Sequence, residues 1–578
     1  MTSSAGVALG AALPPGAGAQ SAPVEGHPSP AGRRPRRDLW RGPYLALLCG
    51  IVGFGAALRI RQWVHGRSLW LDEASLVQNL DARNGMDLTR PLENGQIAPH
   101  GWLWLVDLTD RAGLADERAL RAVPLVLGCA TLVVVAGLAA VVLRSRLAVL
   151  LTVALAAISP WLIGYSNDVK QYSADTFAVT TLLLATVLAA RAPDHARRLA
   201  LWALAVAVGV WISQAAVIVA PALGALLLVA AARRGRRPAL TLLALATPAA
   251  ISLLVELRLL LANTAASPGL DRFWRRAYPP DPLGWDGFAE WLGRTGTAFS
   301  RNPLSMAPAQ LVLGMAVAGF AVVAVRRDLL TAVILATPAG VAVLGGLLRV
   351  YPPSGRLVLF VVPAMLVLVA AALDGAIGLA GWLLGRGSAG PGRRIPLPAR
   401  LAARLAAPLL PLGALTLALL VAWPAAGRVP GTLMRGADQE ELASAFAAVA
   451  EARAPGDAVV LSSALRQFAR VYGPRYQMTD AGLLTARPKG ERCDPDVLPW
   501  QLRDHSRVWL IGGHLWRHEQ AILAVLGRNG QVARAERWRR ARVVLVEMTP
   551  RRPRDAGQVA LPTTGSSCLL FRPVPPLR

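Results

Sequence analysis

The stretch "AVPLVLGCATLVVVAGLAAVVLRSR", residues 122–146, decides the fold class, because an unbroken apolar run leads directly into a basic cluster. A helix needs roughly 20 mostly apolar residues to cross about 30 Å of hydrocarbon. The whole chain has the same character: 54% of its 578 residues are hydrophobic, only 17% are charged, and the mean hydropathy is +0.43. The sequence therefore predicts a multi-pass α-helical membrane protein.

Eleven segments satisfy this criterion of length and apolar character. They are residues 42–60, 121–143, 147–164, 174–190, 199–213, 215–232, 238–260, 308–325, 329–348, 357–384 and 405–423. When the arginine-rich connections are placed in the cytoplasm, every basic cluster falls on one side. The net charge of +26 therefore reflects arginines that mark the cytoplasmic side of the membrane, and no nucleic-acid partner is expected. A single long helix through "WISQAA", residues 211–216, would lower the count and reverse the later sidedness, but the later arginine clusters argue against it.

Three regions follow from this topology. Residues 1–41, rich in Ala, Gly, Pro and Ser, predict a disordered cytoplasmic tail. Residues 42–423 predict the membrane domain, set in the plasma or inner membrane with the N-terminus inside. Residues 424–578 alternate helical patterns with short apolar runs of strand type, which predicts an extracytoplasmic α/β domain. Cys493 and Cys568 are the only cysteines of that domain, and an oxidising compartment predicts a disulfide between them.

Four loops face the outer compartment in this topology, and they hold the polar constellations: residues 61–120, 164–175, 261–307 and 349–356. The first loop carries Asp72 and Glu73 in "SLWLDEASLVQNL". One interpretation is that Asp72 is the N-cap of a helix at the membrane surface and that Glu73 favours the positive end of its dipole. The other is that a partly desolvated carboxylate acts as a general base on a substrate hydroxyl. The two interpretations are compatible.

Lys170 draws attention because the chain has 61 Lys and Arg residues, of which only Lys170 and Lys489 are lysine. A compact, flexible ammonium suits a point contact with a phosphate. Three further polar or aromatic side chains lie on the same segment, namely Tyr165, Asp168 and Tyr172. The alternative is that Lys170 forms a local ion pair with Asp168 or extends its ammonium to the membrane interface.

Together these residues resemble the GT-C superfamily of polytopic glycosyltransferases, and within it the protein mannosyltransferase and aminoarabinose transferase branch. Four motifs carry the resemblance, in order along the chain: "LDEA" (71–74), "APHGWLWL" (98–105), "YSNDVKQYSAD" (165–175) and "YPPSGRLVLFVVP" (351–363). The resemblance implies a polyprenyl-phosphate-linked sugar donor and transfer outside the cytoplasm to an acceptor glycan, lipid or protein of the cell envelope.

The resemblance also implies roles for individual residues. Asp72 matches the catalytic base, and Glu73 would support it, orient the acceptor or help hold a metal where one is used. Lys170 and Arg356 would neutralise the departing lipid phosphate. His100 departs from the family pattern around "HPP" and would be a substrate contact. The cofactor stays unknown, and a divalent metal is left open. "LIGGHLW", residues 510–516, lacks the G-x-G-x-x-G pattern of a nucleotide site.

Two other classes of function stay open. A lipid or glycan transporter would also span the membrane several times, but it should carry ionisable residues or broken helices at mid-membrane depth. The sequence places its clearest charges at the membrane edges instead. A non-catalytic scaffold or sensor that displays the outer domain predicts that Asp72→Asn has no effect on sugar transfer.

Overall fold

The computed structural model describes residues 41–83, 85–111, 117–282, 284–386, 397–431, 441–478, 483–488, 500–513, 516–549 and 569–573. Leu47–Arg578 forms one compact unit, and Met1–Ala46 forms another, of which only the first residues of helix α1 are described. The predicted tail lies outside the described residues apart from Arg41, and so do both partners of the predicted disulfide, Cys493 and Cys568.

Nine helices in the described part of the chain are long and apolar enough to cross a membrane. They are α1 (Arg41–Val64), α5 (Ala122–Val142), α8 (Tyr172–Ala190), α10 (Gln214–Arg234), α11 (Arg236–Ala265), α14 (Ala309–Arg326), α15 (Leu329–Leu347), α16 (Val362–Arg386) with the preceding 3-10 helix η4 (Gly355–Val361), and α17 (Leu397–Ala426). The multi-pass helical fold is confirmed.

The other two predicted spans are present as shorter helices. Residues 147–164 form α6 (Arg146–Ile158) and α7 (Pro160–Tyr165), which meet at Ser159, and residues 199–213 form α9 (Ala196–Ile212). The count of eleven spans therefore stays a prediction.

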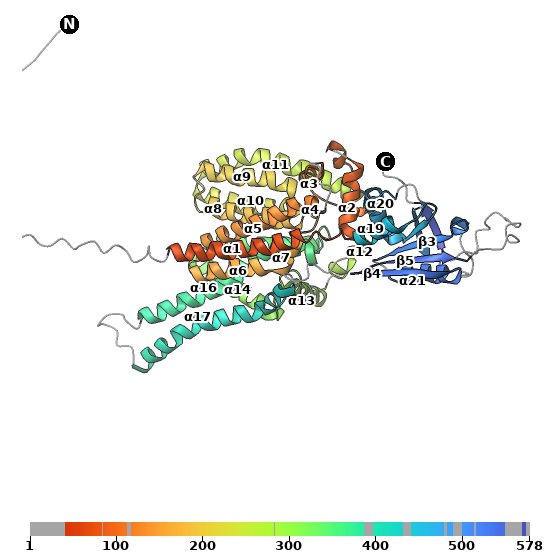
Figure 1. Cartoon of the computed structure of the whole chain (residues 1–578). Coiled ribbons are helices and arrows are strands. Elements are labelled where there is room, and N and C mark those ends of the chain that lie inside the picture. The colour runs from red at the N-terminus through yellow and green to blue at the C-terminus, as the bar shows by residue number, and fades with distance from the viewer. Residues whose placement is uncertain are drawn as a thin grey trace, which may run out of the picture. The chain divides into compact units, whose positions relative to one another are not determined.

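The tight hairpin predicted at "WISQAA" is confirmed, because α9 ends at Ile212 and α10 begins at Gln214. Ser213 caps α10 by accepting a hydrogen bond from the Ala216 N–H at 2.9 Å. The Asp175 carboxylate accepts hydrogen bonds from the Ser213 hydroxyl at 2.7 Å and the Ala215 N–H at 3.1 Å. These contacts hold the hairpin against α8. Helices α8, α9, α10 and α11 lie side by side (Figure 1).

Close helix contacts use small residues and one buried arginine. A Cβ at Gly319 in α14 would come within 1.8 Å of the Leu368 carbonyl oxygen in α16, so only glycine allows the two backbones to approach this closely. Arg59 of α1 is 1% exposed and donates to the carbonyls of Ala156 at 3.3 Å and Ala157 at 3.4 Å. These carbonyls lie at the end of α6, where no further helical turn satisfies them.

The C-terminal region contains a six-stranded sheet in the order β4-β5-β3-β1-β2-β6, and β1 pairs in parallel with both β2 and β3. The strands are β1 (Ala458–Ser462), β2 (Leu483–Pro488), β3 (Arg507–Gly512), β4 (Gly530–Trp538), β5 (Ala541–Met548) and β6 (Leu569–Pro573). Helices α19 (Leu442–Ala452) and α20 (Arg466–Arg475) pack on one face of the sheet, and α21 (Trp516–Arg528) packs on the other. The predicted α/β fold of this region is confirmed.

The first long loop folds into short helices that share a core with the C-terminal sheet. These elements are α2 (Leu71–Ala82), η1 (Gly85–Thr89), η2 (Glu93–Gly95), α3 (His100–Arg111) and α4 (Glu117–Leu120). Fully buried side chains of the loop, including Leu76 and Trp102, belong to one apolar cluster with Phe468 and Tyr472 of α20. The Leu69 N–H also donates to the Tyr472 hydroxyl at 2.9 Å. The C-terminal region therefore helps to fix the start of α2.

Candidate active site

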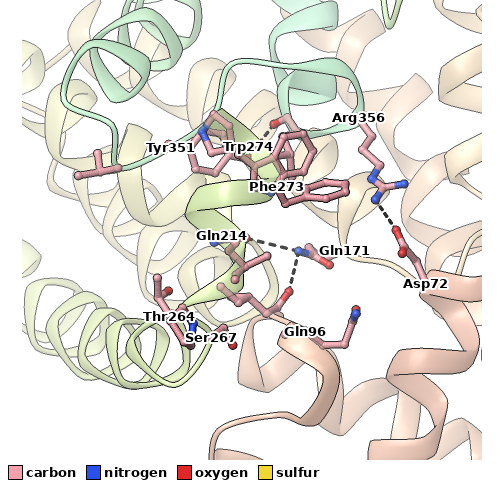
Figure 2. A pocket seen from close by; sticks show the side chains of 18 of the residues that line it. Asp72, Gln96, Gln171, Gln214, Thr264, Ser267, Phe273, Trp274, Tyr351 and Arg356 are labelled. Atoms are coloured by element: carbon pink, nitrogen blue, oxygen red, sulfur yellow. Dashed lines mark hydrogen bonds and ion pairs between the residues drawn. The ribbon is translucent and has the colours of Figure 1, made fainter. Parts of the chain in front are cut away.

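All four loops predicted to face one compartment contribute to a single cavity of about 780 Å³. The first long loop, between α1 and α5, supplies Asp72 and Gln96, and the segment at the start of α8 supplies Lys170, Gln171 and Tyr172. The wall opposite comes from α12 (Gly269–Trp274), from Tyr278, which follows the 3-10 helix η3 (Arg275–Ala277), and from the segment before α16. Its lining includes Phe273, Trp274, Tyr278, Arg349, Tyr351 and Arg356. Figure 2 shows the Arg356 side chain reaching toward Asp72.

Asp72 and Arg356 form an ion pair at the wall of this cavity. Their side chains are 25% and 23% exposed, so both groups reach solvent and a ligand could reach both. The Arg356 guanidinium also lies over two aromatic rings, 5.0 Å from the Trp70 centroid and 5.7 Å from the Tyr172 centroid. Both rings lie within the range of a cation–π contact, which helps to hold the guanidinium in place.

The interpretation of Asp72 as an N-cap is wrong. Helix α2 begins at Leu71, so Asp72 lies inside the first turn, with Trp70 in the cap position. Glu73 makes the capping contact instead, because its Oε2 accepts a hydrogen bond from the Trp70 N–H at 3.0 Å. The Asp72 side chain is thereby left to face the cavity.

Lys170 lines the cavity with a side chain that is almost wholly enclosed by protein, since the residue is 5% exposed. Its ammonium donates a hydrogen bond to Oε1 of Gln96. Burial lowers the pKa of Lys170 to about 8, even though the Asp72 carboxylate acts to raise it. The proposed ion pair between Lys170 and Asp168 does not form within the described residues, because Asp168 pairs with Arg67.

Glu73 is fully buried and is not among the residues that line the cavity. Its Oε1 accepts from the Val169 N–H at 2.7 Å and from Arg121 Nε at 3.0 Å. Its Oε2 accepts from Arg121 Nη2 at 2.7 Å and from Arg67 Nη1 at 2.9 Å. Burial alone would raise the pKa of Glu73, but the two guanidiniums hold it well below its usual range. Glu73 therefore joins α2 to the turn that carries Lys170.

Two more of the predicted residues lie behind the cavity wall. The buried Asp168 carboxylate accepts a hydrogen bond from Arg67 and so belongs to the same charge cluster as Glu73. The Tyr165 ring stacks on Trp161 at 5.7 Å between centroids and meets the edge of Tyr172 at 5.1 Å. Tyr165 therefore supports Tyr172, which does line the cavity.

His100 is fully buried away from the cavity lining and pairs with Glu256 of α11. Its Nδ1 lies 3.0 Å from Glu256 Oε1, and its backbone N–H donates to the same oxygen at 3.1 Å. Sequence reasoning missed Glu256, although a lone carboxylate in the apolar run "ISLLVELRLLLA", residues 251–262, needs a buried partner.

Several lining residues were not foreseen as site residues, among them Gln96, Gln171, Phe273, Trp274 and Tyr351. The two glutamines form no sequence pattern that would mark them as site residues. The aromatic residues could have been found, since "RFWRRAYPPDPLGW" (272–285) combines rings and arginines in a loop at the membrane edge.

The lining does not fit a metal held by several protein side chains. Among the described residues that line the cavity, Asp72 is the one carboxylate, and it is paired with Arg356. Across the described ranges, no three His, Cys, Asp or Glu side chains gather closely enough to hold a metal ion.

No protein-family model matches the chain, and no curated protein matches its sequence. Solved structures do resemble it. ArnT from Cupriavidus metallidurans bound to undecaprenyl phosphate is 14% identical over 88% of this chain and 98% of its own, with a TM-score of 0.45. In the apo state the TM-score is 0.47, with 14% identity over 86% of this chain and 98% of that one.

The archaeal oligosaccharyltransferase AglB from Archaeoglobus fulgidus, in complex with an inhibitory peptide and a dolichol-phosphate, is 14% identical with a TM-score of 0.43. The match covers 75% of this chain but only 64% of AglB, so the chain spans a little less than two thirds of that protein. These are transferases of the kind that the sequence resemblance predicted. Every one of these TM-scores lies below 0.5.

Proposed function

We propose that this protein is a membrane glycosyltransferase that moves a sugar from a polyprenyl-phosphate-linked donor to an acceptor glycan, lipid or protein outside the cytoplasm. The observation that carries the proposal is the joint presence of Asp72, Lys170 and Arg356 around one cavity with aromatic walls. A donor of this class has its tail in the bilayer and its phosphate at the interface. A site for it needs a base, cations and apolar surface at the ends of membrane helices.

The two cations suit the phosphate of such a donor. Arg356 offers a planar fork of N–H donors, and Lys170 offers a compact point charge. When the bond between the sugar and the phosphate breaks, the electron pair stays on the phosphate oxygen, and positioned cations stabilise that charge. Phe273, Trp274 and Leu261 give the same cavity apolar surface for the first part of the lipid tail.

The ion pair between Asp72 and Arg356 suggests an exchange of partners. When the donor phosphate binds, Arg356 turns from the Asp72 carboxylate to the phosphate and stays supported by the rings of Trp70 and Tyr172. Asp72 is then free to accept the proton of the acceptor hydroxyl. The acceptor oxygen forms a bond to the anomeric carbon, the bond from that carbon to the phosphate breaks, and polyprenyl phosphate leaves.

Transport of a lipid or glycan is the second candidate, and the buried carboxylate of Glu256 inside α11 favours it. A transporter moves the labelled lipid across the membrane without making a new glycosidic bond. A glycosyltransferase moves label from the lipid to another molecule. The two functions therefore differ in the chemical identity of the labelled product.

The test is sugar transfer from a radiolabelled polyprenyl-phosphate-sugar pool, in membranes that contain the wild type, Asp72→Asn or the control Asp87→Asn at matched protein levels. Asp87 lies in the same long loop, and its side chain is 50% exposed. We expect transfer to fall by a factor of about 10² to 10⁴ in Asp72→Asn and to stay unchanged in Asp87→Asn. Undiminished transfer in Asp72→Asn would refute the base assignment, and label that crosses the membrane unaltered would favour transport.

A further inference from the structure

A second cavity, of about 880 Å³, adjoins the first. The two share Tyr278 and Arg349 in their walls. The second cavity is formed by η3, the prolines that follow it and helix α13 (Trp285–Arg301), and its lining residues are Arg275, Arg276, Tyr278, Pro279, Pro280, Asp281, Gly287, Glu290, Trp291, Arg294 and Arg349. It is built mainly from the long loop whose arginines the proposed reaction does not use.

The wall of this cavity is held in place by specific contacts. Trp291 is 1% exposed, and its indole N–H donates to the Ala277 carbonyl at 2.9 Å. Gly287 permits close packing, because a Cβ there would meet Pro280 Cγ at 2.9 Å. Arg349 has a φ of 56°, a left-handed conformation that is uncommon for a residue other than glycine, asparagine or aspartate. Backbone strain of this kind gathers at ligand sites, where it fixes the direction of a side chain.

The charges around this cavity are not balanced. Four arginines line it against two carboxylates, Asp281 and Glu290. The Arg349 guanidinium lies 3.6 Å from Asp281, whose side chain is 78% exposed. Within the part of the chain that the structure describes, the guanidiniums of the other three arginines, Arg275, Arg276 and Arg294, form no hydrogen bond or ion pair. Guanidiniums that line one cavity repel one another, and a bound anion reduces that repulsion. Arginine suits phosphate or carboxylate, because its planar fork can donate two parallel hydrogen bonds to either group.

We propose that this arginine-lined cavity binds an anionic group, phosphate or carboxylate, of the acceptor. The proposal rests on the proposed function and deepens it, because it names the chemical class of the acceptor. An acceptor anchored there by its anionic group would extend past Tyr278 and Arg349 into the first cavity, where its hydroxyl would meet Asp72. Neutral acceptors lack this anchor and would be poor substrates.

The test uses the full-length protein in phosphatidylcholine nanodiscs and radiolabelled inorganic pyrophosphate as the probe. The variant Arg275→Gln/Arg276→Gln/Arg294→Gln removes three charges that line only the second cavity. The matched control Arg233→Gln/Arg236→Gln/Arg237→Gln removes three exposed charges near the junction of α10 and α11. Size-exclusion chromatography and thermal unfolding are measured on both variants to check that each of them folds.

We expect the wild type and the control to bind pyrophosphate alike and the first variant to bind it about tenfold or more weakly. All three should bind polyprenyl phosphate equally, since that ligand uses the first cavity. Equal pyrophosphate binding by the two variants, or none by the wild type, would overturn the inference about the second cavity. Failure of the wild type to bind polyprenyl phosphate would instead overturn the proposed function, through a separate probe.

A second arm identifies the source of the anion. In nanodiscs of phosphatidylglycerol, an acceptor site should keep its affinity for pyrophosphate within about threefold once salt has screened the surface charge. Complete competition by phosphatidylglycerol would show that bilayer headgroups occupy the cavity, which would refute its role as an acceptor site.

Discussion

Arg121 holds both carboxylate oxygens of Glu73, with Nε 3.0 Å from Oε1 and Nη2 2.7 Å from Oε2. The two side chains are 2% and 0% exposed, so this bidentate pair is shielded from water. Asp72, the residue before Glu73, points into the cavity and pairs with Arg356, and the Asp72 side chain is 25% exposed. Two adjacent acids thus have separate tasks, because the first turn of α2 directs one into the protein and the other toward a ligand.

The first prediction concerns this buried pair. Glu73→Gln removes the charge that Arg121 and Arg67 surround. The buried Arg121 guanidinium then loses its paired carboxylate, while Arg67 keeps its ion pair with Asp168. Breaking a buried pair from one side costs about 3 to 5 kcal/mol. We therefore expect a large drop in the thermal unfolding midpoint of the purified protein. Glu93→Gln is the control, because Glu93 is 57% exposed and its pair with Arg470 should contribute about 1 kcal/mol or less. Equal midpoints for the two variants would contradict the structural role of Glu73.

The second prediction is a pH dependence of donor binding. Because burial lowers the pKa of Lys170 to about 8, its ammonium is present below that pH and lost above it. Affinity for polyprenyl phosphate should therefore fall as the pH rises through about 8, while the phosphate, with a second pKa of about 6, keeps its charge. Lys170→Arg stays protonated over this range, so its affinity should remain level from about pH 7 to pH 9.5. Equilibrium binding at several pH values provides the check, and parallel curves would show that another group titrates.

The membrane fold could be predicted from the sequence because long apolar runs and arginine clusters are local signals. The break between α9 and α10 at Ser213 was also predictable. The apolar stretch had to hold two spans for the later arginine clusters to lie on the cytoplasmic side. The α/β region followed from alternating strand and helix patterns. The short helices α6 and α9 show the limit of this approach, because helix length depends on how each span packs and tilts among its neighbours.

The site was predictable where a residue type was unusual for its position, as with Lys170 and Asp72. Contacts across the fold were not predictable. Nothing local to Glu73 shows that Arg121 and Val169 will enclose it, and nothing near His100 shows that Glu256 lies beside it. The second cavity lay within a loop whose arginines were visible in the sequence, but their arrangement around one hollow depends on the packing of α13.

The third prediction follows from the competition between Asp72 and a phosphate for Arg356. Asp72→Asn removes the carboxylate that holds Arg356 in the unliganded protein. Polyprenyl phosphate should therefore bind this variant a few-fold more tightly, by about 0.5 to 1 kcal/mol, since the pair is partly exposed. Transfer should be lost at the same time. Tighter binding combined with lost transfer separates a catalytic base from a residue that only shapes the site. Weaker binding by Asp72→Asn would contradict the exchange of partners.

The fourth prediction tests how the C-terminal region supports the site. The Tyr472 hydroxyl accepts from the Leu69 N–H at 2.9 Å and donates to Glu117 at 3.0 Å, just before the start of α2. Tyr472→Phe leaves the buried Leu69 N–H without its partner, which costs about 1 to 3 kcal/mol. We expect a lower unfolding midpoint and a reduced turnover for transfer, with donor affinity nearly unchanged, because the loosened α2 positions Asp72 less well while Lys170 and Arg356 keep their places.

Tyr476→Phe serves as its control, since Tyr476 is also a tyrosine of this region and packs against Tyr472 with 6.2 Å between ring centroids. Its midpoint and turnover should stay close to those of the wild type. A purely structural role for Tyr472 would lower the amount of active protein while leaving turnover per folded molecule unchanged. A positioning role lowers turnover per folded molecule, so active-site titration with labelled polyprenyl phosphate distinguishes the two. If turnover per bound donor is the same in Tyr472→Phe and the wild type, the C-terminal region stabilises the protein without orienting its catalytic base.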